Sequence, residues 1–111
     1  MSCFGVTALG ADALGALDLV IAKRATGKPG IEEKPSYTRE LLADRNKRLK
    51  KLGEEAAELV AACADGDRQR AIDETADLVY HALVALHALD AGLDDVRIEL
   101  ERRREAPRPR A

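Results

Sequence analysis

The segment from Arg70 to Ala91 constrains the fold most, because it has the length of a helix and carries apolar residues on almost every side. A helix of this kind is buried among other helices and does not lie on a surface. Three antiparallel helices from one chain cannot easily surround it. The pattern therefore predicts an all-α helical bundle that is completed by homodimerisation, with a second copy of the chain supplying the missing cover.

Helical signals recur along the rest of the chain, and no segment favours a strand. Aromatic residues make up only 3% of the sequence, and alanine and leucine supply most of the apolar mass, which disfavours a β-sandwich. We predict four to five helices, at about residues 12–23, 37–43, 46–64, 70–91 and 95–104, with a polar loop over residues 26–35. Residues 1–104 are predicted to form a single domain, and residues 105–111 a disordered tail.

Local signals place the ends of these helices. Ser36, Asp67 and Asp94 are predicted N-caps, and Gly92 is predicted to end the helix over residues 70–91. On the third predicted helix, one arc at 100° per residue is predicted to face the core. Its members are Leu49, Leu52, Ala56, Leu59, Val60 and Cys63.

Composition excludes several classes of protein. The net charge of −2 argues against a dedicated nucleic-acid binder. The longest uncharged internal stretch, residues 78–89, is far shorter than the roughly 20 residues that span a bilayer. Residues 1–22 contain no basic residue, so we expect no secretory signal. Cys3 and Cys63 form no CxxC pair, which favours a reducing cytoplasm.

Charge is divided sharply between two neighbouring segments. Residues 23–51 hold ten Lys and Arg against four acidic residues, whereas residues 54–77 hold eight acidic residues against two arginines. A basic segment beside an acidic one suggests a site for a metal ion with a polyphosphate. The alternative is that both segments are solvated helix faces.

Helical spacing favours the site over the solvated faces. Glu55 and Glu58 lie three residues apart and share one side of a helix, and Glu74 and Asp77 repeat that spacing on the next helix. His81 lies one turn beyond Asp77. Converging carboxylates repel each other unless a cation neutralises them, and Mg²⁺ prefers such oxygen ligands. A di-iron bundle would need Glu-x-x-His pairs, and a zinc site would need Cys/His clusters; neither pattern is present.

The sequence also resembles a known family. Glu54-Glu55-x-x-Glu58 followed by Glu74-x-x-Asp77 is similar to the metal motif of the all-α MazG-like NTP pyrophosphohydrolase superfamily. The flanking residues sharpen this likeness to the phosphoribosyl-ATP pyrophosphohydrolase family, over about residues 13–103. The segments that carry it are residues 36–42, 50–58 and 76–84. Two residues depart from the family pattern: Asp44 stands where glycine is usual, and Arg48 where isoleucine is usual.

The resemblance implies a Mg²⁺-dependent hydrolysis of phosphoribosyl-ATP to phosphoribosyl-AMP and pyrophosphate, the second step of histidine biosynthesis. The implied metal ligands are Glu55, Glu58, Glu74 and Asp77. Glu54 and Glu55 are the implied catalytic carboxylates. The implied substrate-binding residues are Arg24, Ser36, Tyr37, Lys47, Lys50, Lys51 and His81.

Two other functions fit the same residues. The first is a housecleaning pyrophosphohydrolase that acts on dNTPs or damaged nucleotides with the same metal site. The second is a non-enzymatic helical dimerisation module with a structural cation. The lysines beside the carboxylates favour an enzyme, because a structural cation gives them no role.

Overall fold

The computed structural model describes residues 4–26 and 36–105, with only the backbone of residues 4–12. These residues form an all-α fold of five helices and contain no strand, which confirms the predicted class. Across the described ranges, no helix is long and apolar enough to cross a membrane. The helices are α1 (Phe4–Thr26), α2 (Tyr37–Ala43), α3 (Arg45–Ala64), α4 (Arg68–His87) and α5 (Leu93–Glu105).

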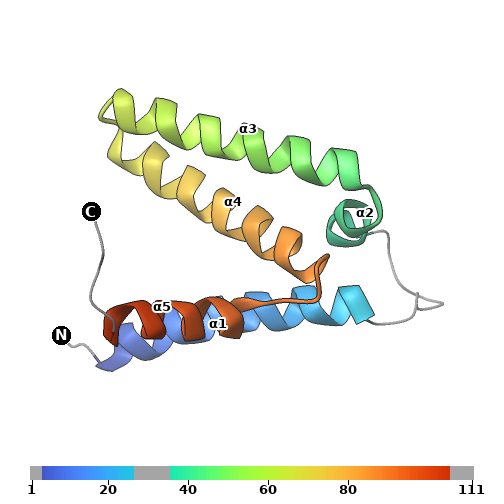
Figure 1. Cartoon of the computed structure of the whole chain (residues 1–111). Helices are drawn as coiled ribbons and strands as arrows, with labels where there is room; N and C mark the ends of the chain where they lie inside the picture. Colours follow the sequence, from blue (N-terminus) through green and yellow to red (C-terminus); the bar gives the residue numbers. More distant parts are fainter. Residues whose placement is uncertain (1–3, 27–35, 106–111) are drawn as a thin grey trace.

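The α3 and α4 helices pack along each other as an antiparallel hairpin (Figure 1). The turn between them is tight because Gly66 takes a φ of 71°, which a glycine adopts without strain. The side chain of Asp67 then accepts a hydrogen bond from the backbone N–H of Arg70, as predicted for an N-cap. This short connection sets the pairing of α3 with α4, and hence brings their acidic sides together.

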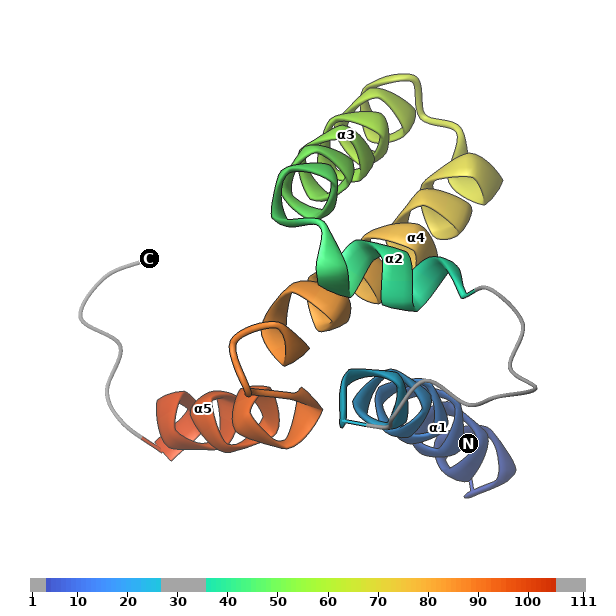
Figure 2. The ribbon, with the colours of Figure 1, turned by 90° about the vertical axis from the view of Figure 1, so that its right-hand side faces the viewer.

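The apolar core lies at one end of this hairpin, where α1, α2 and α4 meet. Its buried members are Ile21, Leu41, Leu83 and Val84. Figure 2 shows α2 crossing α4, with α1 and α5 lying beyond the end of the hairpin. Most of the hairpin therefore extends past the core that the single chain builds.

The buried side of α3 differs from the predicted arc. Leu49 and Val60 are 45% and 68% exposed, and Cys63 is exposed, so the prediction that Cys63 is a core residue is wrong for the single chain. The buried residues of α3 are instead Glu55 and Ala62. The reason is that α4 packs beside the apolar arc, along the line of the carboxylates, and leaves much of the arc uncovered.

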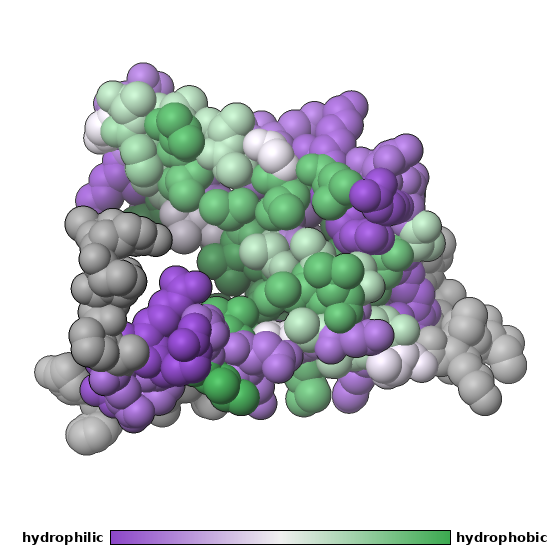
Figure 3. All heavy atoms as spheres, viewed as in Figure 1, coloured by the Kyte–Doolittle hydropathy of each residue, from purple (hydrophilic) through white to green (hydrophobic). Residues whose placement is uncertain are grey.

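The α4 helix is also less enclosed than its apolar pattern predicts. Figure 3 shows hydrophobic side chains gathered on one face of the molecule, along α4 and the adjoining side of α3. Ile72 is 46% exposed, and only His81, Leu83 and Val84 of α4 are buried. One chain does not cover this helix, in agreement with the expectation that a single copy cannot surround it.

Several predicted helix boundaries need correction: among them, α1 ends at Thr26 and not at about residue 23, and α4 begins at Arg68 and not at about residue 70. The α1 helix begins at Phe4, because the glycines before Asp12 cost only about 1 kcal/mol each and do not end a helix. The α4 helix ends at His87, and Asp90, with a φ of 61°, makes the left-handed turn predicted for Gly92. The α5 helix begins at Leu93, with the backbone N–H of Gly92 donating to the Asp95 side chain, so Asp94 lies inside the helix.

Two further predictions concern residues at the limits of the described ranges. The loop over residues 26–35 lies outside the described residues, apart from Thr26, which ends α1. The tail over residues 105–111 lies outside them as well, apart from Glu105, which ends α5.

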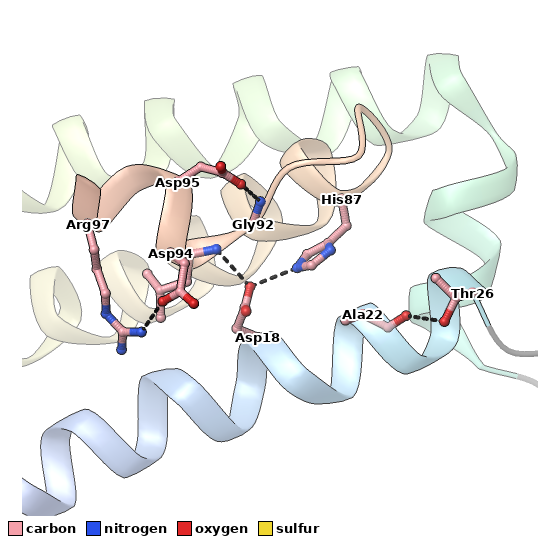
Figure 4. A network of polar contacts seen from close by, with 9 residues as sticks. Asp18, Ala22, Thr26, His87, Gly92, Asp94, Asp95 and Arg97 are labelled. Atoms are coloured by element: carbon pink, nitrogen blue, oxygen red, sulfur yellow. Dashed lines mark hydrogen bonds and ion pairs between the residues drawn. The ribbon is translucent and has the colours of Figure 1, made fainter. Parts of the chain in front are cut away.

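A half-buried polar network ties three helices together (Figure 4). Asp18 on α1 accepts hydrogen bonds from Nε2 of His87, at 2.7 Å, and from the backbone N–H of Leu93, at 3.0 Å. A Cβ on Gly92 would lie 3.0 Å from Cε1 of His87 and 3.2 Å from Oδ1 of Asp18. A larger residue at this position would therefore have to displace both side chains by a few tenths of an ångström. In this network His87 links α4 to α1.

Candidate functional site

Three carboxylates converge between α3 and α4. One oxygen each of Glu55, Glu58 and Glu74 lies within 4.8 Å of the others. Glu55 is buried, Glu74 half-buried and Glu58 exposed, so the group opens towards solvent on one side. Asp77, the fourth predicted ligand, lies outside this group and its side chain is exposed. The hairpin thus brings together three of the four predicted metal ligands.

This carboxylate group is unsatisfied within the described residues. Oε1 of Glu55 and Oε1 of Glu74 are buried and have no hydrogen-bond partner. Burial, a hydrogen bond with Glu58 and the negative charges of Glu58, Glu55 and Asp77 all raise the pKa of Glu74. Buried carboxylate oxygens without donors are costly, and a hard cation with oxygen ligands is what such a donor set fits.

Lysines border the carboxylate group. Nζ of Lys51 lies 3.5 Å from Glu54 and 3.8 Å from Glu55, and Nζ of Lys50 lies 4.0 Å from Glu54. The electrostatic interaction with Tyr37 raises the pKa of Lys51, burial lowers it, and the hydrogen bond with Glu54 and the charges of Glu54 and Glu55 raise it further. Glu54 itself lies outside the three-carboxylate group and is held by the two lysines.

A cluster of rings continues the site towards α2. The Tyr37 ring stacks against Tyr80 at 6.4 Å and meets His81 edge-on at 6.1 Å, while Nζ of Lys47 lies 5.4 Å from the Tyr37 ring centre. The Tyr37 side chain is the exposed member of the cluster. An exposed aromatic face beside lysines and carboxylates could stack against a nucleotide.

The ring of His81 is held in one orientation. Its Nδ1 lies 2.9 Å from the backbone carbonyl of Asp77, which can only accept, so Nδ1 carries the proton. Its Nε2 is buried and has no partner among the described residues. Tyr80 packs edge-on against this ring at 4.9 Å.

Thr38 and Tyr80 are the members of this region that sequence reasoning missed as site residues. Oγ1 of Thr38 and the hydroxyl of Tyr80 lie 2.6 Å apart, across 42 positions of sequence. Burial raises the pKa of Tyr80, although the hydrogen bond with Thr38 lowers it. No spacing signal pairs residues so far apart, so the contact could not be read from the sequence.

Arg24, near the end of α1, contacts Ser36 at the start of α2. Nη1 of Arg24 donates to Oγ of Ser36 at 3.3 Å, and the backbone N–H of Arg39 donates to the same oxygen at 3.2 Å. The second contact confirms Ser36 as the N-cap of α2. Ser36 Oγ therefore already accepts two hydrogen bonds.

Comparison with known proteins agrees with this arrangement. The model of the phosphoribosyl-ATP pyrophosphohydrolase family matches residues 16–104. The chain belongs to this family. Two relatives named phosphoribosyl-ATP pyrophosphatase illustrate the membership. The protein from Azorhizobium caulinodans is 45% identical over 91 residues, covering 81% of this chain and 80% of its own. That from Agrobacterium fabrum is 45% identical over 96 residues, covering 86% of each chain.

This family match spans all three parts of the site: α2 with its tyrosine, and the α3 and α4 helices with their carboxylates. It confirms the resemblance drawn from the motifs. It also includes Asp44 and Arg48, the two residues at which the resemblance predicts a departure from the usual family residues.

Proposed function

We propose that this chain hydrolyses phosphoribosyl-ATP to phosphoribosyl-AMP and pyrophosphate, the second step of histidine biosynthesis. Membership of the family and the names of its relatives support the substrate. The observation that carries the chemistry is the group of three carboxylates, two of them with unsatisfied buried oxygens, next to Lys51. Hydrolysis of a polyphosphate requires both a cation site and positive side chains nearby.

We propose Mg²⁺ as the cation. Glu55, Glu58 and Glu74 would hold it, and Asp77, three residues after Glu74 on α4, would be the fourth ligand. All four offer the carboxylate oxygens that this ion prefers. When bound, it supplies charge neutralisation for the phosphates and polarises the phosphorus that water attacks.

The remaining roles fall to side chains around that group. Lys51, with Lys50 and Lys47, would bind phosphate oxygens and stabilise the charge that develops on the pyrophosphate leaving group. Glu54 would orient or deprotonate the attacking water, since it is not part of the three-carboxylate group. Water then attacks the α-phosphorus, the α–β anhydride bond breaks, and pyrophosphate leaves.

Binding of the rest of the substrate is proposed for the α2 side of the site. The Tyr37 ring would stack on the adenine or ribose side, next to His81. Arg24 and Ser36 would contact the phosphoribosyl end, with Ser36 also capping α2. We also propose a cytoplasmic location, which the two cysteines without a CxxC pair favour.

Pyrophosphate release by purified protein tests this function directly. Phosphoribosyl-ATP made in situ is supplied with Mg²⁺, beside a panel that includes dCTP and dUTP. We expect fast release from phosphoribosyl-ATP, and none from the Glu55→Gln variant, which controls for a contaminating phosphatase. Release from dNTPs alone would replace the histidine pathway with nucleotide housecleaning. Tight Mg²⁺ binding without release from any substrate would indicate a structural cation.

We further propose that the active form is a homodimer in which a second copy covers the exposed apolar faces of α3 and α4. Val60 and Ile72 are exposed on the hairpin, and burying such side chains contributes about 1.5 to 3 kcal/mol each. Light scattering at micromolar concentration is expected to give the mass of two chains.

A charge placed in that face should break the dimer. Val60→Glu is expected to give the mass of one chain, because a carboxylate buried in an apolar interface has no partner. Asp73→Asn, an exposed change on α4, is the control and should remain a dimer. A wild-type protein of monomeric mass would refute the proposed assembly.

A further inference from the structure

The α2 helix presents Tyr37 to the site, yet it is too short to hold itself in place. It has seven residues, and an isolated helix of that length is not stable in water. The last carbonyls of any helix also lack partners within the helix. The position of Tyr37 therefore depends on what fixes α2 from outside.

Arg48 on α3 fixes the C-terminal end of α2. Its Nη1 donates to the backbone carbonyl of Leu41 at 3.1 Å and to that of Leu42 at 3.0 Å. A guanidinium at the C-terminus of a helix also interacts favourably with the helix dipole. One side chain thus satisfies two of the free carbonyls with charge-assisted bonds.

Asp44 completes the same corner between α2 and α3. Its backbone N–H donates to the carbonyl of Glu40, which closes α2, and its side chain accepts from the backbone N–H of Lys47 at 3.0 Å, which opens α3. Asp44 and Arg48 are the two residues at which the sequence departs from the family pattern. Both departures serve one corner, and neither side chain belongs to the carboxylate group.

The N-terminal half of α2 is fixed by different contacts. Arg24 donates to Ser36, and Thr38 is hydrogen-bonded to Tyr80. Tyr37 lies between these two anchors, with its ring over Lys47 and against His81. The anchors at both ends make α2 a rigid support for the Tyr37 ring.

We propose that Arg48 is a positioning residue for the nucleotide. It acts through Tyr37, by holding α2 at the angle that puts the ring beside the lysines of α3. This inference rests on the proposed function, because it assumes that Tyr37 stacks against the substrate.

Kinetics of Arg48→Met, Tyr37→Ala and the double variant test the proposal. We expect Arg48→Met to raise KM for phosphoribosyl-ATP about tenfold with little change in kcat, a size typical of coupling between groups in contact. The double variant should have the KM of Tyr37→Ala, because Arg48 has nothing left to position. Arg48→Lys, which keeps a donor for the carbonyls, should recover most of the affinity.

Arg45→Met is the matched control, since Arg45 is exposed at the start of α3 and its loss removes the same charge. A wild-type KM in Arg48→Met would overturn the proposal. So would a KM increase in the double variant equal to the product of the two single increases, because Arg48 would then stabilise the fold without acting through Tyr37.

Two readouts separate this inference from the proposed function. Hydrogen exchange should speed up over residues 37–43 in Arg48→Met and stay unchanged over residues 50–64. Exchange over residues 37–43 that is equal in Arg48→Met and in the wild type would refute the anchoring.

Binding of α,β-methylene-ATP, whose α–β linkage cannot be cleaved, should follow the same pattern as KM. If the wild type binds this analogue but releases no pyrophosphate, the proposed function fails and the binding data still decide the role of Arg48. If it neither binds nor hydrolyses nucleotides, both proposals are wrong.

Discussion

Glu74→Gln is expected to remove pyrophosphate release and, in metal-free protein, to raise the melting temperature. Activity should fall by about a thousandfold or more, because the charge stabilisation that a bound cation gives to a phosphoryl transition state is large. Stability should rise because the amide carries no charge beside Glu55 and Glu58. The opposite direction of the two effects distinguishes a metal ligand from a residue that merely supports the fold.

The pH dependence of stability determines whether Glu74→Gln raises or lowers the melting temperature of the metal-free protein. Burial, the hydrogen bond with Glu58 and the neighbouring negative charges raise the pKa of Glu74 above its ordinary value of 4.5. Glu74 therefore binds its proton more tightly in the folded chain than in the unfolded one. Its contribution to stability is complete below about pH 4.5 and is lost as pH rises through the folded pKa. The metal-free wild type should thus lose stability over that window, and Glu74→Gln should lose less.

Thermal unfolding in a chelator, at pH 4.5 and pH 7.5, measures both effects. At pH 7.5 we expect Glu74→Gln to melt about 3 to 5 °C above the wild type. Added Mg²⁺ should raise the melting temperature of the wild type more than that of the variant, because only binding to the folded state stabilises it. Asp73→Asn, one residue away and exposed, should match the wild type in activity and in its response to Mg²⁺. An active Glu74→Gln protein would exclude Glu74 as a ligand.

The acidic site could be predicted because its residues are separated by single helical turns. Glu55 and Glu58 share one side of α3 by spacing alone, and a tight turn at Gly66 necessarily pairs α3 with α4. The caps at Ser36 and Asp67 followed from residue type in the same way. Local geometry was sufficient for each of these predictions.

Contacts that join distant parts of the chain could not be predicted. Nothing in the sequence pairs Thr38 with Tyr80, and nothing directs Arg48 back to the carbonyls of α2. The buried side of α3 was misjudged for a related reason. An apolar arc shows which residues favour burial, but a single chain can leave it open, and Cys63 lies in that open part.

Asp18 should be the polar side chain outside the site whose loss affects stability most. It accepts hydrogen bonds from His87 on α4 and from the backbone N–H at the start of α5, so one carboxylate holds three helices together. Asp18→Ala would leave both donors without a partner in a half-buried place. We expect a loss of about 2 to 3 kcal/mol in the free energy of unfolding, and a fall of about 10 °C or more in melting temperature.

Acid should weaken the same contact. Burial raises the pKa of Asp18, but the hydrogen bonds from His87 and Leu93 and the charges of His87 and Arg97 outweigh it, and the net shift is downwards from 3.8. The unfolded chain therefore binds this proton more tightly than the folded one. The stabilisation is fully present above about pH 4 and disappears as pH falls through the folded pKa.

Asp18→Asn separates the charge of this residue from its shape. The amide keeps one acceptor oxygen but replaces the other with a donor and does not titrate, so the variant should be less stable than the wild type at pH 7. As the pH falls through the lowered folded pKa of Asp18, the difference should narrow, because the wild-type carboxyl then becomes neutral too. Denaturant unfolding at pH 7 and pH 3 measures both values, with Asp94→Asn, an exposed acid of α5, as the control. An equal difference in the free energy of unfolding at both pH values would mean that the charge of Asp18 does not contribute to stability. Its hydrogen-bond geometry alone would then join α1 to α4 and α5.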